Sequence, residues 1–556
     1  MPVSARPAAW WRSEMTHYDV LSRRPWRPLI MGRKGAVASN HPAATQAGLD
    51  ALRAGGTAAD AAVAVSLALG VAEPFMSGLG GDGFYHFYDA GTGVSTVFNG
   101  SGTAPALAPP EEYRDGMPNS GHRSAGVPGS LAGVAQLHGR HGELPWAELV
   151  RPAAALAAEG VGVTHTYRRM ANTMKSVLLR DAAASAIYLV DGELPALGAI
   201  LVQPALARTL EMVAEGGAEA FYRGPIAAMV AAASEAGGGL IREADIQAFE
   251  PEVQAAISAR YRSYEVRQTP PNSTGFVLLQ ELLIAEAFDI KAMGYLSAEH
   301  IHTLVEAKKL AFLDRERLAG DPRFGAGDLS EILDPANARK LAARIDPRRA
   351  ASIPLQLPAP NEGETTYFCI VDAWGNAVSA IQSLNSAFGS GVTAGEAGFL
   401  LNNRMATWHL EPHHPNVLAP GKRARHTMNA PLILKDGKLW GILGTPGADN
   451  QVQVNFQAVS ALIDFGMDPQ QIVEAPRWFS DQPGQSATWP HKGKDELTIE
   501  EDVGPEVLEK LRALGHTLVT QRPIHGTCSL ECIRVLENGM RMAGSDPRRD
   551  GWAGAY

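Results

Sequence analysis

Cysteine is scarce in this chain of 556 residues, which contains only Cys369, Cys528 and Cys532. Three thiols at these positions form no disulfide framework, and their spacing matches no zinc-finger pattern. Disulfide-rich chains are typical of oxidising compartments, so the scarcity indicates a reducing one. We therefore interpret the three thiols as buried structural side chains.

Long apolar segments and an excess of basic charge are also missing. No stretch reaches the roughly 18 apolar residues that a membrane-spanning helix requires. Residues 10–15 carry Trp-Trp-Arg-Ser-Glu-Met in place of the apolar core of a secretory signal. The 49 basic and 59 acidic residues give a net charge of −10, which excludes a strong footprint for phosphate backbones. We expect a cytoplasmic protein with no membrane or nucleic-acid partner, and a poorly ordered N-terminal extension over residues 1–33.

The remaining composition, with 45% apolar and 19% charged residues, is that of a globular protein with a large core. Apolar spacing and alanine content predict helices, and alternating β-branched and aromatic residues predict strands. The helical segments are 43–54, 57–69, 130–160, 204–236, 297–318, 468–475 and 504–514; the strands are 83–89, 94–98 and much of 365–447. Helices flank strand-rich centres in both halves, which predicts a layered α+β fold.

Thr365 is the most informative residue. It opens a strand-like run over 365–372, directly behind the proline- and glycine-containing spacer 355–364, and a turn at 374–376 leads into a second strand. A hydroxyl residue in this position suits a self-cleaving precursor. Breakage of the Glu364–Thr365 bond would free an α-amine with a pKa near ~7.7–8.0, which can act as the general base for the hydroxyl of the same residue. The alternative is a threonine that only satisfies β propensity.

Short motifs along residues 34–556 resemble the γ-glutamyltranspeptidase family. They lie at 54–64, 78–84, 127–130, 261–266, 270–275, 365–367, 372–379, 383–385, 388–391, 400–403, 444–447 and 545–548. The resemblance implies a four-layer αββα sandwich, the fold of N-terminal nucleophile hydrolases. It also implies a large fragment, 34–364, paired with a small fragment, 365–556, as an αβ heterodimer. It implies no cofactor.

The same resemblance assigns roles around the nucleophile. Ser383 stands where the family has a threonine hydroxyl that supports the nucleophile, and Asn385 matches an asparagine that helps to hold the α-amino group of the substrate. Gly447 and Ala448 match the main-chain donors of the oxyanion hole, although the family usually has glycine at the second position. Because the donor is a backbone amide, a methyl group is acceptable there if the backbone is not left-handed.

Four substrate-binding positions depart from the family pattern. Where the family has a glutamine and an aspartate that grip the α-amino group, this chain has Arg404 and Thr407; the serine pair for the α-carboxylate is replaced by His426 and Thr427. A pocket without its acidic anchor should bind an α-amino acid poorly. Arg404 beside His426 suits an acyl group with a carboxylate and no amine. The alternative is an Arg404 that pairs with a structural acid.

Two other patterns are interpreted as structural. Gly78, Gly80 and Gly83 match a dinucleotide-binding spacing, but a helix precedes them and a strand follows, which reverses the required order. We predict a tight turn that packs helix against sheet. His409, His413 and His414 fall in a proline-rich loop without a common ligand spacing, so we predict no metal site.

These observations predict a self-cleaving N-terminal-threonine amidohydrolase of the γ-glutamyltransferase type. Its substrate would be a γ-glutamyl or related small carboxylate-bearing amide, cleaved through an acyl-enzyme, with water or an amine as acceptor. The alternatives are a glutaryl (cephalosporin)-type acylase, an oxamate-type amidohydrolase, or an uncleaved scaffold that binds small acids.

Overall fold

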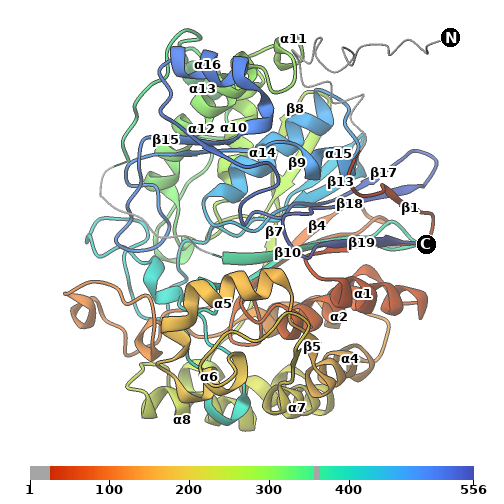
Figure 1. Ribbon diagram of the computed structural model, residues 1–556, viewed down its shortest axis with the longest axis vertical. Coiled ribbons are helices and arrows are strands. Elements are labelled where there is room, and N and C mark those ends of the chain that lie inside the picture. Colours follow the sequence, from red (N-terminus) through yellow and green to blue (C-terminus); the bar gives the residue numbers. More distant parts are fainter. Residues whose placement is uncertain (1–24, 356–363) are drawn as a thin grey trace, which may run out of the picture.

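The computed structural model describes residues 25–355 and 364–556, and it forms four layers (Figure 1). Two seven-stranded sheets lie face to face in the centre, and helices cover the outer face of each. One hydrophobic cluster fills the space between the sheets, and a larger cluster lies under each helical layer. The predicted αββα sandwich is therefore confirmed. Most of the predicted N-terminal extension, residues 1–24, and most of the predicted spacer before Thr365, residues 356–363, lie outside the described residues.

The first sheet carries the predicted nucleophile strand at its centre. Its order is β19 (Trp552–Ala555), β2 (Ala36–Ser39), β10 (Glu364–Val371), β11 (Ala377–Asn385), β3 (Asp82–Tyr88), β4 (Ser95–Gly100) and β7 (Glu252–Ala255). All neighbouring pairs are antiparallel. The hairpin between β10 and β11 turns through Gly375, whose φ of +90° favours glycine. The predicted hairpin is confirmed, and β10 begins one residue before the expected start.

The second sheet covers the inner face of the first. Its order is β1 (Ile30–Gly32), β18 (Arg541–Ser545), β17 (Glu531–Val535), β13 (Lys438–Gly444), β12 (Leu432–Lys435), β9 (Tyr264–Gln268) and β8 (Ile257–Tyr261). β1 falls inside the region expected to be a poorly ordered extension, yet it pairs with β18. The predicted boundary at residue 33 is therefore too late, because the edge of β18 orders this short segment.

The helices divide into two layers around these sheets (Figure 1). The first layer contains α1 (Pro42–Arg53), α2 (Ala58–Ala72), α3 (Ser130–His141), α4 (Trp146–Glu159), α7 (Pro204–Tyr222) and α8 (Pro225–Ala236), with α5 (His165–Leu178) and α6 (Ala182–Tyr188) beside it. The second contains α10 (Gly275–Ala285), α12 (Ala298–Leu318), α13 (Pro335–Ala342), α14 (Asn450–Ile463), α15 (Pro469–Glu474) and α16 (Pro505–Ala513). The predicted helices 43–54, 57–69, 297–318, 468–475 and 504–514 are confirmed to within three residues. The predicted helical segments 130–160 and 204–236 each divide into two helices, because glycine and proline interrupt them at 142–145 and 224–225. None of the described helices is long and apolar enough to cross a bilayer.

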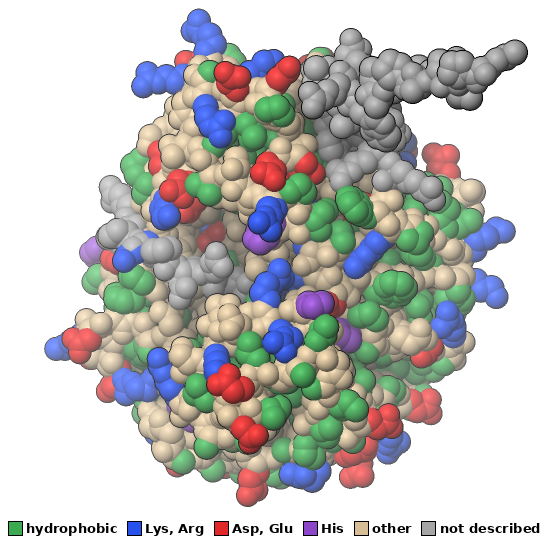
Figure 2. Space-filling model, viewed as in Figure 1, with side chains coloured by type: hydrophobic (Ala, Val, Ile, Leu, Met, Phe, Trp, Pro, Cys, Tyr) green, Lys and Arg blue, Asp and Glu red, His purple; other side chains and the backbone are tan. Residues whose placement is uncertain are grey.

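Smaller elements complete the fold. A three-stranded sheet of β14 (Trp478–Asp481), β15 (Glu496–Glu500) and β16 (Leu518–Gln521) lies beside the second helical layer. The short elements are α9 (Glu243–Gln247), α11 (Ile290–Met293), β5 (Val161–Gly162) and β6 (Ile200–Leu201). On the face shown in Figure 2, basic and acidic side chains are interspersed rather than gathered by sign.

The glycine-rich turn before β3 is a packing device, as predicted. It connects the end of α2 to β3, so the helix does precede the strand. A Cβ on Gly80 would lie 2.1 Å from the carbonyl oxygen of Leu400, and one on Gly81 would lie 2.5 Å from that of Ser383. Only glycine lets the turn approach β11 this closely.

We expect Gly81→Ala to lower the apparent melting temperature, because the added methyl group must push the backbone of Ser383 away. The cost of such overpacking is typically about 1–3 kcal/mol. Gly139→Ala in α3 is the matched control, since a Cβ there meets no described atom within 4 Å. It should leave the melting temperature unchanged or slightly higher, because alanine favours helix. Equal melting temperatures for the two variants would contradict the packing argument.

Candidate active site

Thr365 and Ser383 meet at an irregularity in the β10–β11 pairing. The register shifts between Glu364 and Thr366, which is a bulge of the kind that re-aims a side chain. The Thr365 hydroxyl donates a hydrogen bond of 3.3 Å to Ser383 Oγ, and both side chains are buried. Ser383 Oγ also accepts a hydrogen bond of 2.7 Å from the backbone N–H of Asn385. The structure therefore brings the predicted nucleophile and its predicted supporting hydroxyl together.

Two buried charged residues fix the backbone beside Thr365. Arg549 donates from Nη1 to the Thr365 carbonyl over 2.9 Å. The next hydroxyl, Thr366 Oγ1, donates over 2.7 Å to the carboxylate of Glu73, the residue that ends α2. Sequence reasoning missed both Glu73 and Arg549, because their distance along the chain from Thr365 gave no local signal. They hold the start of β10 in one position.

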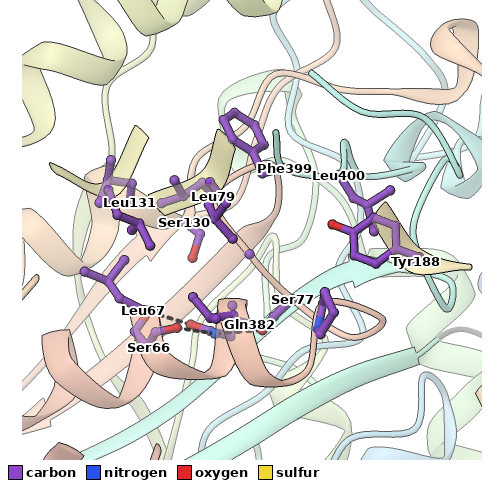
Figure 3. Close-up of a pocket in the computed structure, with 16 residues that line it drawn as sticks. Ser66, Leu67, Ser77, Leu79, Ser130, Leu131, Tyr188, Gln382, Phe399 and Leu400 are labelled. Carbon is purple, nitrogen blue, oxygen red and sulfur yellow. Dashed lines mark hydrogen bonds between the residues drawn. The ribbon is translucent and has the colours of Figure 1, made fainter. Parts of the chain in front are cut away.

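Behind β11, a small cavity shows how the strand is anchored (Figure 3). Its volume is about 20 Å³, enough for about one water molecule. Gln382 points into it from β11, accepting from Ser66 Oγ over 2.6 Å and donating to Ser77 Oγ over 2.9 Å. Because side chains alternate along a strand, Gln382 and Ser383 face opposite sides. The cavity therefore belongs to the packing of the sheet and not to substrate binding.

The predicted oxyanion loop follows β13 and leads into α14. β13 ends at Gly444, where a Cβ would lie 2.3 Å from the ring of Tyr367, two residues beyond Thr365. Gly447 has φ +128°, and a Cβ there would lie 2.3 Å from Cys528 Sγ. The end of β13 thus packs against Tyr367 of β10, and the loop that follows requires glycine at position 447.

Ala448 is left-handed, with φ +49°. We expected a methyl group to be acceptable at position 448 only if the backbone there is not left-handed. The structure does not meet this condition. For an alanine this conformation costs roughly 1–2 kcal/mol. The surrounding structure holds it in place: the Ala448 carbonyl accepts from Gln451 N over 3.2 Å at the start of α14. Strain of this kind is common at functional sites.

Arg404 pairs with a buried carboxylate that the sequence analysis did not identify. From the 3₁₀ helix η5 (Arg404–Thr407), its Nε donates to Asp82 Oδ2 over 2.8 Å, and Nη1 donates to Asn385 Oδ1 over 3.0 Å. Its Nη2 is buried and has no hydrogen-bond partner among the described residues. The alternative prediction, that Arg404 pairs with a structural acid, is therefore correct for Nε. The donor Nη2 remains without a partner among the described residues.

The charges around Arg404 add up to zero. Burial opposes ionisation of Asp82, but Arg404, His426 and the Gly102 amide lower its pKa from 3.8 to about 2, so it is an anion. His426 Nε2 lies 3.4 Å from Asp82 Oδ2. Burial and the charge of Arg404 lower the pKa of His426 to about 4, so its ring is neutral at pH 7. This buried group carries one cation and one anion, which are already paired.

The other two predicted substrate residues lie at the edges of this group. Thr407 donates its hydroxyl to the Arg404 carbonyl over 2.7 Å, so it completes the turn of η5. Thr427 is buried next to His426 in sequence. The structure thus gathers Asn385 and His426 around the ion pair of Arg404 with Asp82, and Thr407 serves the local turn.

Two histidines of the predicted loop, His409 and His414, cluster with Glu316, and their ligand atoms lie within 4.8 Å of one another. His409 and His414 lie with Nε2 at 4.0 and 3.5 Å from Glu316 Oε2, while His413 is exposed. The backbone N–H of Asn416 donates to His414 Nδ1 over 3.0 Å. The neutral ring of His414 therefore carries its proton on Nε2, which points toward Glu316 and offers a metal ion no lone pair. His409 differs, because its Nδ1 lies 3.2 Å from Glu411 Oε2 and donates, so that its Nε2 keeps a lone pair.

We expect Asp82→Asn to destabilise the protein, because Arg404 would keep a buried charge without its partner. Removal of one member of a buried pair typically costs about 3–5 kcal/mol. The lowered pKa of Asp82 stabilises the fold above pH 4, and this contribution is lost as the pH falls toward 2. Melting temperatures measured across this range should fall more steeply in the wild type than in the variant.

Asp50→Asn is the control, since Asp50 is exposed and its contact with Arg53 lies on the surface. Its melting temperature should match that of the wild type at every pH. An Asp82→Asn protein as stable as the control would contradict the pairing.

Comparisons with known proteins agree with this geometry. Residues 44–556 match the family model described as gamma-glutamyltranspeptidase. The chain is 36% identical over 530 residues to the glutathione hydrolase-like YwrD proenzyme of Bacillus subtilis (strain 168), covering 94% of this chain and 99% of that protein. It is 35% identical over 509 residues to the acylase ACY 1 proenzyme of Pseudomonas sp. (strain SE83), covering 89% of each.

A solved structure shows the same architecture. The crystal structure of cephalosporin acylase from Bacillus halodurans superimposes with a TM-score of 0.87 at 30% identity, covering all of this chain and 99% of the other. Family model, relatives and structure all extend over nearly the whole chain. The chain belongs to the γ-glutamyltranspeptidase family.

Proposed function

We propose that this protein is a self-cleaving amidohydrolase whose nucleophile is Thr365 and whose substrate is an amide of a small acid that carries a second carboxylate. One observation carries the proposal: the buried contact of the Thr365 hydroxyl with Ser383 is linked through Asn385 to Arg404. A nucleophile and a buried cation with one unused donor are thereby held in one hydrogen-bonded chain. The names of the relatives, glutathione hydrolase-like and acylase proenzymes, support the same class of reaction.

Maturation would create the base. Thr365 Oγ1 attacks the preceding carbonyl carbon, and the acyl group shifts from nitrogen to oxygen, which breaks the C–N bond and frees the α-amine. Water then hydrolyses the ester, which frees the hydroxyl and separates the two fragments. An unperturbed α-amine is about one tenth to one sixth neutral at pH 7, so a modest shift is sufficient. The free amine then takes the hydroxyl proton as Thr365 attacks a substrate amide. Before cleavage that nitrogen is an amide and cannot act as a base.

Acyl specificity would follow from the one remaining donor of Arg404. Its Nη2 can donate to a carboxylate at the far end of the acyl group, a charge-assisted bond. Asp82 is already paired with Arg404, so it is a poor partner for a substrate ammonium. A glutaryl group would fit this charge pattern better than a γ-glutamyl group, which carries an ammonium as well.

The proposal includes a cytoplasmic enzyme. The three cysteine side chains, Cys369, Cys528 and Cys532, are buried in the structure and form no disulfide with one another, which supports a reducing compartment.

Thr365→Ala should stay a single chain of 59.1 kDa on a denaturing gel, whereas the wild type should separate into residues 1–364 and 365–556. Thr365→Ser is the matched control, because it keeps a hydroxyl and should still cleave. Edman sequencing of the small fragment should begin at Thr365. An active wild-type preparation that remains unbroken would refute the mechanism, and an inactive one would favour the small-acid-binding scaffold.

Arg404→Gln should lower kcat/KM for glutaryl p-nitroanilide by about tenfold or more, since a charge-assisted bond is lost. The same change releases Asp82 to meet an α-ammonium, so the ratio of γ-glutamyl to glutaryl turnover should rise. Arg404→Lys separates charge from geometry: it keeps a cation near Asp82 but removes the donor Nη2, so the ratio should lie between those of the wild type and Arg404→Gln. An equal loss with both acyl groups would show that Arg404 does not read the acyl carboxylate.

A further inference from the structure

Three buried side chains of metal-binding types lie together in the second helical layer, away from Thr365 along the chain. His302 and Glu306 stand four residues apart on α12, so they share one face of the helix. His516 joins them from the turn that follows α16, and α16 packs against α12 (Figure 1). One ligand atom of each residue lies within 4.8 Å of the other two. Sequence reasoning missed the group, because His302 and His516 are 214 residues apart.

The turn after α16 brings His516 back onto α12. Gly515 has φ +97°, a left-handed conformation that favours glycine at the end of a helix. The backbone N–H of His516 donates to the Leu511 carbonyl over 3.2 Å, which closes the turn. His516 Nε2 then lies 2.9 Å from His302 Nδ1. The backbone thus holds the two rings with one nitrogen of each facing the other.

The hydrogen bonds of His302 determine which of its nitrogens can bind a ligand. Nε2 lies 2.8 Å from the Asp346 carbonyl, which can only accept, so Nε2 carries a proton. The neutral ring therefore has its lone pair on Nδ1, toward His516. A histidine that donates one N–H to a backbone carbonyl and offers its other nitrogen has the usual arrangement of a metal ligand. His414 in the other histidine cluster lacks this arrangement, because its proton is on the nitrogen that faces Glu316.

The other two side chains are available in the form that a metal requires. Burial, with the nearby charge of Lys309, lowers the pKa of His516 to about 3, so its ring is neutral at pH 7. Glu306 accepts from Lys309 Nζ over 2.9 Å and from the backbone N–H of Ala351 over 3.1 Å, one bond to each oxygen. Each carboxylate oxygen can accept two bonds, so one position remains on each. Two imidazoles and a carboxylate are a known ligand set for zinc.

A cavity beside His516 leaves space for a further ligand. Its volume is about 60 Å³, which is enough for water. Lys309, the segment 350–352 and residues 495–497 contribute to its walls, together with Ser480 and the turn 515–517. A fourth ligand to an ion at His516 can therefore come from a water molecule in this cavity.

The charges around the group favour a cation. Glu306 and Lys309 are both buried and carry opposite charges. The half-buried Glu496 adds a second carboxylate. Asp495 and Lys494 are exposed and offset one another, since Lys494 lies 3.6 Å from Glu496. One negative charge is left over among these groups, and it favours a positively charged ligand.

We propose that a zinc ion binds to His302 Nδ1, His516 Nε2 and an oxygen of Glu306, with a water molecule from the cavity as the fourth ligand. To admit the ion, the proton of His516 moves from Nε2 to Nδ1, so the ring stays neutral and no proton is lost. The two facing nitrogens move apart from 2.9 Å to about 3.3–3.4 Å, the separation that Zn–N bonds of about 2.0–2.1 Å require at a tetrahedral angle.

The ion would join parts of the chain on either side of the spacer. The first two ligands precede Thr365 and the third follows it. The segment 346–352, near the end of the proposed large fragment, is fastened at the same place, because Ala350 N donates to the Leu514 carbonyl over 2.7 Å. After the cleavage that the proposed function requires, zinc would tie the end of the large fragment to the small one. Zinc binding itself does not depend on that cleavage.

Metal uptake tests the assignment directly. Protein freed of metal with a chelator and then incubated with zinc chloride should retain about one zinc ion per chain after gel filtration. His516→Gln should weaken zinc binding by about a hundredfold or more, because loss of an outer-shell partner alone typically costs about 10–100-fold. His165→Gln is the control, since His165 is exposed and belongs to neither histidine cluster, and it should bind zinc like the wild type. A wild-type protein that retains no zinc would overturn the proposal.

Cobalt distinguishes this site from the histidine cluster at Glu316. Co²⁺ absorbs visible light far more strongly in a four-coordinate site than in six-coordinate water. Titration with cobalt chloride should give this absorption in the wild type and in His409→Gln, but not in His516→Gln. An absorption that is lost in His409→Gln and kept in His516→Gln would place the metal beside Glu316 and contradict the assignment.

Lys309→Gln tests the site without removing a ligand. Lys309 competes for Glu306, so loss of its ammonium should tighten zinc binding by about tenfold and enlarge the rise in melting temperature that zinc causes. Unchanged zinc binding in this variant would contradict the role of Glu306. Thr365→Ala should bind zinc like the wild type whether or not the wild type cleaves itself. A chain that binds zinc but is never cleaved would therefore count against the proposed function alone.

Discussion

The site depends on the antiparallel pairing of β10 with β11 at the centre of the first sheet. Both strands are buried on both faces, with helices on one side and the second sheet on the other. A strand in such a position cannot slip in register without moving its whole side-chain set. The bulge before Thr366 is the one local departure, and it turns Thr365 toward Ser383. Rigid pairing with one irregularity gives the hydroxyl a fixed direction.

Charge balance decides what the acyl pocket can bind. A lone buried arginine would attract any anion, but Arg404 shares its charge with Asp82, and burial keeps His426 neutral. A carboxylate ligand must therefore compete for the one edge of the guanidinium that remains. This arrangement favours selectivity between acyl groups over high affinity. A ligand gains binding free energy only when its carboxylate reaches Nη2 in the right geometry. Asn385 couples this edge to Ser383, so acyl recognition and the nucleophile belong to one hydrogen-bonded unit.

The local sequence pattern was sufficient to predict helices and strands, because residues close in sequence determine them. The β-branched and aromatic run after the spacer predicted β10 to within one residue, and alanine content predicted α1 and α2. Three residues of the site could not be predicted in this way. Asp82, Glu73 and Arg549 reach the site from distant parts of the chain, and nothing near them in sequence announces a contact with Arg404 or the start of β10. The backbone conformation of Ala448 could not be predicted either, because the residue type does not reveal a left-handed φ. Strand β1 was not predicted, because its three residues are too few to show a period and its order depends on pairing with β18.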